Sequence, residues 1–196
     1  MHRLCLLALM TLLLSLTSSL QAQGLTSAMK AQLDQDIQMI RTWVSLEKVI
    51  DAVRKQNELD IPLSAIKRMD ASWKKVMKQK GSPNNLMIRA FHHPAAQFLR
   101  KVADKHRPRY PEMFLCDNKG ANVAVTQFTS DYWQGDEDKW LNAFNNGKGK
   151  VFIGEPEFDK STRTMSVQVS VPVMDQGKTI GVLVVGVSLK ALGKQQ

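Results

Sequence analysis

Residues 169–189 read VSVPVMDQGKTIGVLVVGVSL, and this stretch decides the fold. Valines alternate with small or polar residues on both sides of the segment Asp175-Gln176-Gly177-Lys178. A period of two is the pattern of β-strands, and a short polar segment with glycine is typical of the turn in an antiparallel hairpin. The stretch therefore predicts two long strands, 162–174 and 179–189, joined as a hairpin.

The rest of the second half continues the antiparallel pattern. Residues 112–116 predict a strand, and residues 121–127 alternate as a second strand. Between them Asp117-Asn118-Lys119-Gly120 predicts a turn in which glycine supplies the positive φ. A short helix is expected at 135–144 and a further strand at 151–153, which makes five strands in all.

The first half shows helical spacing instead. Thr26 or Ser27 can cap a helix that runs to about Asn57. Apolar residues at steps of three and four form two adjacent stripes, which predict one broad face along a core or a partner. The stripes are Leu33, Ile37, Ile40 and Val44, and Met39, Trp43, Leu46, Ile50 and Val53. Two shorter helices are expected, one from Ser64 and one from about Pro94.

The N-terminal residues carry an export pattern. His2 and Arg3 precede an uncharged apolar run over residues 4–20, and Ala22 suits the small pocket of a signal peptidase. We expect a signal peptide over residues 1–22 and a periplasmic location. The mature chain then forms one domain with a helical part at 23–110 and a sheet part at 111–196. An uncleaved anchor is the alternative, although a membrane span needs roughly 20 apolar residues.

Composition and motifs exclude several classes of function. The net charge is +9, but the basic residues stand singly or in pairs along amphipathic helices, which indicates a solvated face rather than a nucleic-acid site. Cys116 lies in an apolar run that favours a buried structural thiol over a reactive one. No catalytic serine motif or phosphate loop occurs, so we expect no enzyme activity and no cofactor. The histidines and the acidic run lack metal-ligand spacing.

Three segments together resemble the extracytoplasmic PAS-like sensor domains of the Cache or PDC family. They are FLCDNKGANVAVT at 114–126, DYWQGDEDKW at 131–140 and the closing hairpin at 169–189. The resemblance implies an α+β fold in which a long N-terminal helix and shorter helices pack on a PAS-like five-stranded antiparallel sheet. It also implies a small-molecule sensor. We expect a sensor without its own output domain, because no second membrane span or output domain follows, and signalling through a membrane-bound partner.

The resemblance places a ligand under the loop and helix that follow the second strand. The residues there combine aromatic walls with an amide and carboxylates, a mixture typical of small-molecule pockets. The candidate ligand-binding residues are Asp131, Tyr132, Trp133, Gln134, Asp136 and Trp140. Such a site suits a cationic or amine-bearing ligand. Amino-acid-binding relatives carry an Arg-x-Trp-Tyr pattern near this position, which this chain lacks. Alternatively, the acidic residues cap the helix and Trp140 packs on Phe144.

The broad apolar face of the long helix leaves two interpretations open. In one, the helix pairs with a second copy through Met29, Leu33 and Ile37, which gives a homodimer. In the other, helices around Trp73 and Phe98 cover the face within one chain. An interaction or chaperone-like periplasmic protein that uses its long helix is the alternative function. The expected partners are thus a small-molecule ligand, a membrane-bound signalling protein and a second copy, with no nucleic acid.

Overall fold

The computed structural model describes residues 25–159 and 162–194, so the expected signal peptide at 1–22 lies outside the described residues. Within these ranges the chain forms seven α-helices and one short 3-10 turn. The helices are α1 (Ser27–Val44), α2 (Glu47–Glu58), α3 (Leu63–Gln79), α4 (Asn85–His92), α5 (Pro94–Lys105), α6 (Asp138–Phe144) and α7 (Leu189–Leu192), and the 3-10 turn is Asn145–Gly147. None of the helices in the described part has the length and apolarity needed to cross a membrane.

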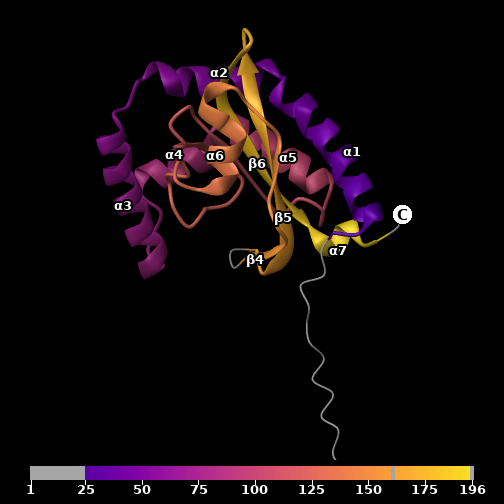
Figure 1. Ribbon diagram of the computed structural model, residues 1–196. Coiled ribbons are helices and arrows are strands. Elements are labelled where there is room, and N and C mark those ends of the chain that lie inside the picture. The colour runs from indigo at the N-terminus through magenta and orange to yellow at the C-terminus, as the bar shows by residue number, and fades with distance from the viewer. Residues whose placement is uncertain (1–24, 160–161, 195–196) are drawn as a thin grey trace, which may run out of the picture.

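A six-stranded antiparallel sheet forms the centre of the fold (Figure 1). Its strands are β1 (Glu112–Cys116), β2 (Asn122–Val125), β3 (Phe152–Ile153), β4 (Glu157–Asp159), β5 (Thr164–Asp175) and β6 (Lys178–Ser188). They lie in the order β2-β1-β6-β5-β3, and β4 also pairs with β5. The hairpin expected at the end of the chain is the β5–β6 pair, with Val171 opposite Leu183. The α+β class with a PAS-like sheet is confirmed.

The sheet has one strand more than the sequence analysis expected. The additional strand is β4, which has three residues and pairs with β5 through Phe158 opposite Met165. Both of these side chains are exposed. A strand this short with an exposed apolar residue gives no alternation of buried and exposed positions, so no periodic signal marks it.

The long N-terminal helix is two helices with a break at Ser45-Leu46. Leu46 takes an extended conformation with φ −72° and ψ 132° and starts α2. A straight helix of some 30 residues would be about 45 Å long and would run past the sheet. The break lets both halves lie against it, with Ile40 of α1 and Val49 and Val53 of α2 fully buried.

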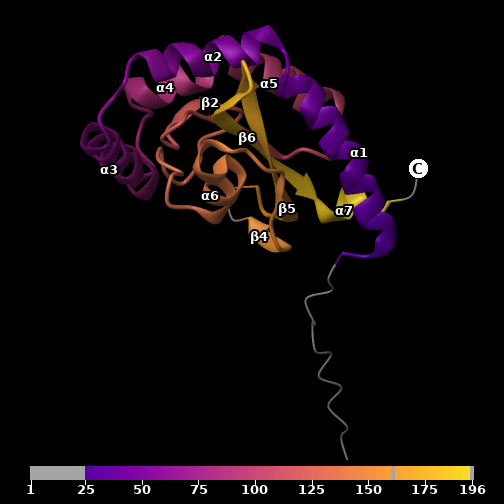
Figure 2. The same ribbon diagram turned by 45° about the horizontal axis from the view of Figure 1, so that its top comes forward.

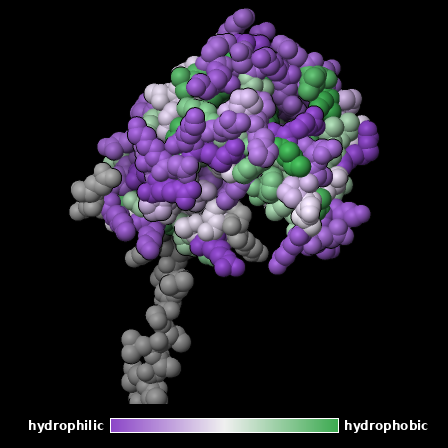
Figure 3. Space-filling view, turned by 180° about the vertical axis from the view of Figure 1, so that it is seen from behind, coloured by the Kyte–Doolittle hydropathy of each residue, from purple (hydrophilic) through white to green (hydrophobic). Residues whose placement is uncertain are grey.

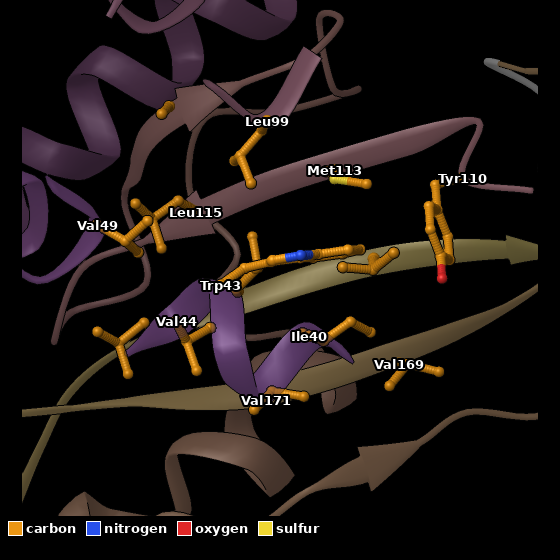
Figure 4. Packing of buried hydrophobic residues seen from close by; sticks show 14 of the residues in the cluster. Ile40, Trp43, Val44, Val49, Leu99, Tyr110, Met113, Leu115, Val169 and Val171 are labelled. Carbon is orange, nitrogen blue, oxygen red and sulfur yellow. The ribbon is translucent and has the colours of Figure 1, made fainter. Parts of the chain in front are cut away.

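Two layers of helices enclose the sheet (Figure 2). Helices α1, α2 and α5 pack on one face, where Trp43 lies among Leu115, Val171 and Tyr110 (Figure 4). Helix α6 packs on the other face, and α3 and α4 enclose that side next to β2. The apolar stripe of α1 is thus covered within one chain, mainly by the sheet, since Leu33 is 1% and Ile37 is 7% exposed.

Helix α4 was not expected from the sequence, because Pro83-Asn84-Asn85 has the composition of a loop. Asn84 instead caps the helix, and its side-chain oxygen accepts a hydrogen bond from the backbone N–H of Met87 at 3.0 Å. His93 then separates α4 from α5, and Pro94 occupies the first turn of α5 as expected.

Candidate functional site

The face of the sheet under α6 holds the candidate site. Because side chains alternate along a strand, Phe114 and Cys116 of β1 and Val182 and Val184 of β6 all lie on this face. Trp140 and Ala143 of α6 pack over them. Phe114 also lines a groove on this face, together with Glu112 and other polar side chains.

Two adjoining cavities form this groove, with volumes of about 280 and 480 Å³. Lys139 of α6, Glu157 of β4 and Gln168 of β5 line both cavities, so they are parts of one groove. Phe114 and Phe152 supply apolar wall. Small-molecule sites in proteins use this combination of apolar walls and a few placed polar groups.

The groove is strongly acidic. Its one lining cation among the described residues is Lys139, whose ammonium nitrogen lies 5.8 Å from the centre of the Phe114 ring and 3.9 Å from a carboxylate oxygen of Glu137. The carboxylates that line it are Glu112, Asp136, Glu137, Asp138, Glu155, Glu157 and Asp159. This excess of negative charge attracts cationic ligands and repels anionic ones.

Two of the six candidate residues line the groove. Gln134 is buried, and its side-chain amide donates to the backbone carbonyl of Asp131 at 3.2 Å and to the Asp131 carboxylate. Asp136 lies exposed at the rim. Of the residues that the sequence analysis missed, Gln168 is a polar residue at an alternating position among valines, and Lys139 is the one basic residue of its acidic segment. Those two signals could have found them.

Tyr132 lines a different and smaller cavity of about 130 Å³, between α2, α4 and β2. Arg89, His93 and Asn122 share this cavity. The Tyr132 hydroxyl accepts a hydrogen bond from the Gln56 side chain at 3.5 Å. Burial raises the pKa of Tyr132 to about 12, so this phenol stays protonated at neutral pH.

The two candidate tryptophans attach the loop before α6, and α6 itself, to the turn between β1 and β2. Trp133 donates its indole N–H to the carbonyl of Lys119 at 2.7 Å, and Trp140 donates to the carbonyl of Asp117 at 3.1 Å. Trp140 also stacks on Phe144 with ring centres 4.6 Å apart. Both indole N–H groups bind the protein itself, so a ligand could contact only the ring faces. Ligand contact by Trp133 or Trp140 stays a prediction.

Helix α3 holds the same loop from the other side. Its Asp70 accepts hydrogen bonds from the backbone N–H groups of Tyr132 at 3.0 Å and Trp133 at 3.2 Å. Lys74 lies 2.7 Å from the Asp70 carboxylate and 3.8 Å from that of Asp131. The loop between β2 and α6, which carries all of the candidate residues except Trp140, is therefore fixed on both sides.

The free cysteine of the described residues, Cys116, is buried. Burial raises the pKa of the Cys116 thiol well above its usual range, so this sulfur is a poor nucleophile. Among residues 25–159 and 162–194, no three His, Cys, Asp or Glu side chains are grouped to hold a metal ion.

Comparison with solved structures gives weak, partial likenesses. The ligand-binding domain of the Campylobacter jejuni chemoreceptor Tlp3 in complex with 4-methylisoleucine is 16% identical, with a TM-score of 0.40, over 85% of this chain and 62% of that one. The extracellular domain of histidine kinase vpHK1S-Z8 is 11% identical, with a TM-score of 0.48, over 84% of this chain and 53% of that one. This chain thus spans only about three fifths of the first solved structures it matches.

Comparison with families is more decisive. Among curated proteins no match was found. A family model described as "Methyl-accepting chemotaxis protein-like, first PDC sensor domain" matches residues 81–194. This match covers more than half of the chain and includes β1, β2, α6 and the closing hairpin. The protein therefore belongs to the methyl-accepting chemotaxis protein-like family of PDC sensor domains, which is the family type that its sequence resembles.

Proposed function

We propose that this protein binds a small amine-bearing molecule in the groove between α6, β4 and the sheet, and reports its presence to a membrane-bound signalling partner. The observation that carries this proposal is the acidic groove on the sheet face of a sensor-family fold. Seven carboxylates and one ammonium group line it among the described residues, and such a surface favours a cation over an anion.

The groove also supports a more specific ligand chemistry. Gln134 and Gln168 place amides that can orient a polar ligand, and Phe114 and Phe152 offer ring faces to its apolar part or its cationic group. Lys139 can pair with an anionic or carbonyl oxygen on the same molecule. We therefore propose a ligand with an amine at one end and an acceptor group at the other.

Binding of amines to the full chain tests the proposal. Isothermal titration with diamines, amino acids and amino-acid amides should identify a compound that binds, and its N-acetylated analogue should bind at least about tenfold more weakly, because the cation is lost. The rim variant Asp136→Asn/Glu157→Gln should weaken the amine by a similar factor. The matched control Asp34→Asn/Glu58→Gln changes the charge equally at exposed positions outside the groove lining and should bind normally. Equal effects of both variants, or equal binding of the acetylated analogue, would refute the proposal.

We also propose export to the periplasm through cleavage after Ala22. The apolar run at 4–20 with its basic start supports this. N-terminal sequencing of protein from the native host should begin near Gln23. Protein with an intact Met1 in a membrane fraction would instead show that the N-terminal segment stays uncleaved as an anchor.

A homodimer through α1 is one of the two interpretations that the sequence left open, and light scattering tests it. Leu33 and Ile37 are buried under the sheet, and the outward face of α1 carries Lys30, Asp34 and Gln38. A helix pair would therefore join polar surfaces. A chaperone-like function would need an exposed apolar face on this helix, and the outward face of α1 is polar. A monomer at micromolar concentration would remove the dimer from the proposal.

A further inference from the structure

A second cleft lies on the other side of the molecule, where the described chain begins and ends. It has a volume of about 730 Å³ and is bounded by α1, by the segment that follows α5 and by α7. Helices α1 and α7 lie next to each other there (Figures 1 and 2). Because α1 and α5 cover the sheet face opposite the groove, the two sites are separated by the sheet.

The cleft is basic because most of its cations have no acidic partner. Lys105, Lys190 and Lys194 line it, are exposed, and form no ion pair with any described residue. Arg107 also lines it and shares its charge with Asp104 at 2.7 Å. Three ammonium groups from two distant elements thus face one concavity without compensation.

The one acidic residue in the cleft lining is already neutralised. Asp36 is 1% exposed and accepts two hydrogen bonds from the Arg109 guanidinium, at 2.8 and 2.9 Å. It accepts a third from the Tyr110 hydroxyl at 2.6 Å. Its carboxylate is therefore paired within the protein. The unpaired lysines make the electrostatic potential in the cleft positive.

Gln32 adds an unused polar group to the same cleft. Its side-chain oxygen is buried and has no hydrogen-bond partner in the described part of the chain. Buried polar atoms normally find a partner, and an unsatisfied one points to a missing donor. A hydroxyl group on a ligand would supply that donor if the half-buried Gln32 side chain turned its oxygen into the cleft.

We propose that this cleft binds a phosphate group that carries a neighbouring hydroxyl, as in a glycerol phosphate. A phosphate monoester carries up to about two negative charges at neutral pH, against one for a carboxylate, and so matches several lysines. Lysine binds phosphate as a point charge and needs no fixed fork geometry. The phosphate can belong to a free monoester or to the headgroup of an anionic phospholipid such as phosphatidylglycerol. The headgroup is a diester with one negative charge, but it also carries hydroxyl groups next to its phosphate.

The surroundings of the cleft fit either source. Lys105, Lys190 and Lys194 are exposed, so a soluble anion can reach them. Seen from behind, the surface of the molecule carries hydrophilic residues interspersed with hydrophobic patches (Figure 3). Leu25 and Lys194, the first and last described residues, belong to the same end as the cleft. Clustered lysine and arginine side chains bind the headgroups of anionic phospholipids through their charge.

The test measures both sources with the full chain. Glycerol 3-phosphate is titrated calorimetrically at low salt, and cosedimentation is measured with vesicles of phosphatidylglycerol and phosphatidylcholine and with vesicles of phosphatidylcholine alone. The variant Lys105→Gln/Lys190→Gln/Lys194→Gln should weaken binding about tenfold or more, because three attractive charges are lost. Gln32→Leu should weaken glycerol 3-phosphate more than inorganic phosphate, which has no carbon-bound hydroxyl.

A matched control separates the cleft from general charge. Lys75→Gln/Lys78→Gln/Lys148→Gln removes the same charge from exposed positions on α3 and after α6, and should leave binding unchanged. Binding of glycerol 3-phosphate assigns the cleft to a free ester, and binding to anionic vesicles alone assigns it to a headgroup. Equal losses in both triple variants, or no binding to either probe, would overturn the proposal. Neither result would affect the groove, which is tested with amines.

Discussion

Asp36 shows how a single buried charge is stabilised in this protein. The Arg109 guanidinium and the Tyr110 hydroxyl bind both of its carboxylate oxygens. Asp36→Asn should lower the free energy of unfolding by about 2–3 kcal/mol, because a partly buried guanidinium loses its counter-charge. Urea denaturation measures this.

The control for Asp36 is an exposed ion pair on the same side of the molecule. Asp104 and Arg107 lie 2.7 Å apart, and both side chains are largely exposed. Asp104→Asn should therefore change the free energy of unfolding by less than about 1 kcal/mol. Equal costs for the two substitutions would contradict the view that burial makes the Asp36 pair important.

The two tyrosines of the chain give a pH test at the same scale. Both side chains are 2% exposed. Burial raises the pKa of Tyr132 to about 12, and burial together with the neighbouring Asp36 raises that of Tyr110. An unfolded tyrosine titrates near pH 10. The native protein should therefore show almost no tyrosinate absorbance at about pH 10, whereas protein unfolded in urea should show about half of it.

The same shifts determine how stability depends on alkaline pH. Because the folded pKa of Tyr132 lies above the unfolded value, its contribution is complete below about pH 10 and is lost as the pH rises toward 12. Tyr132→Phe should make the fall in unfolding free energy over this range less steep. An unchanged slope would show that Tyr132 titrates normally in the folded protein.

At the scale of elements, the attachment of α3 to the candidate loop rests on Asp70. Its carboxylate accepts the backbone N–H groups of Tyr132 and Trp133. Asp70→Ala leaves both donors without this partner and should lower the free energy of unfolding by about 2 kcal/mol. Amide hydrogen exchange should become faster over residues 63–79 and 130–134, because the helix and the loop lose their connection.

Lys74 provides the control for this connection. It contacts the same carboxylate at 2.7 Å, but half of its side chain is exposed. Lys74→Met should therefore cost less than about 1 kcal/mol and leave hydrogen exchange in α3 nearly unchanged. If Lys74→Met accelerated exchange as much as Asp70→Ala, the ion pair and not the backbone contacts would hold the loop.

At the scale of the whole molecule, Cys116 reports on cooperative unfolding. It lies on β1, between β2 and β6 and beneath Trp140, and is completely buried. A thiol reagent reaches it only when both the sheet and the α6 layer open. In a Cys5→Ser background, labelling of the native protein should be at least about a thousandfold slower than that of the unfolded protein.

The dependence of labelling on urea distinguishes global from local opening. If opening is global, the labelling rate should rise with the same urea dependence as equilibrium unfolding. Fast labelling without urea dependence would show that the β1–β2 hairpin opens alone. The groove would then be formed only part of the time.

Much of the fold could be predicted because its signals are local. The period of two in residues 164–175 and 178–188 marks the β5–β6 hairpin before any tertiary contact is known. The break at Ser45-Leu46 carries no such signal, since both neighbouring turns have good helical spacing. The break follows from the size of the sheet that the helix must cover. Helix α4 was missed because its capping Asn84 is also an ordinary loop residue.

The candidate site divides in the same way. The sequence alone predicted five of the six strands and the sensor family, and it singled out the segment 131–140 as a candidate site, because each depends on residues close together in the chain. Only the tertiary structure decided that Gln134 and Lys139 meet Gln168 in one groove, while Tyr132 faces another cavity. It alone brought Gln32, Lys105 and Lys190 to one cleft. These residues come together because elements distant in the sequence pack around the same sheet. A local sequence pattern does not predict that packing.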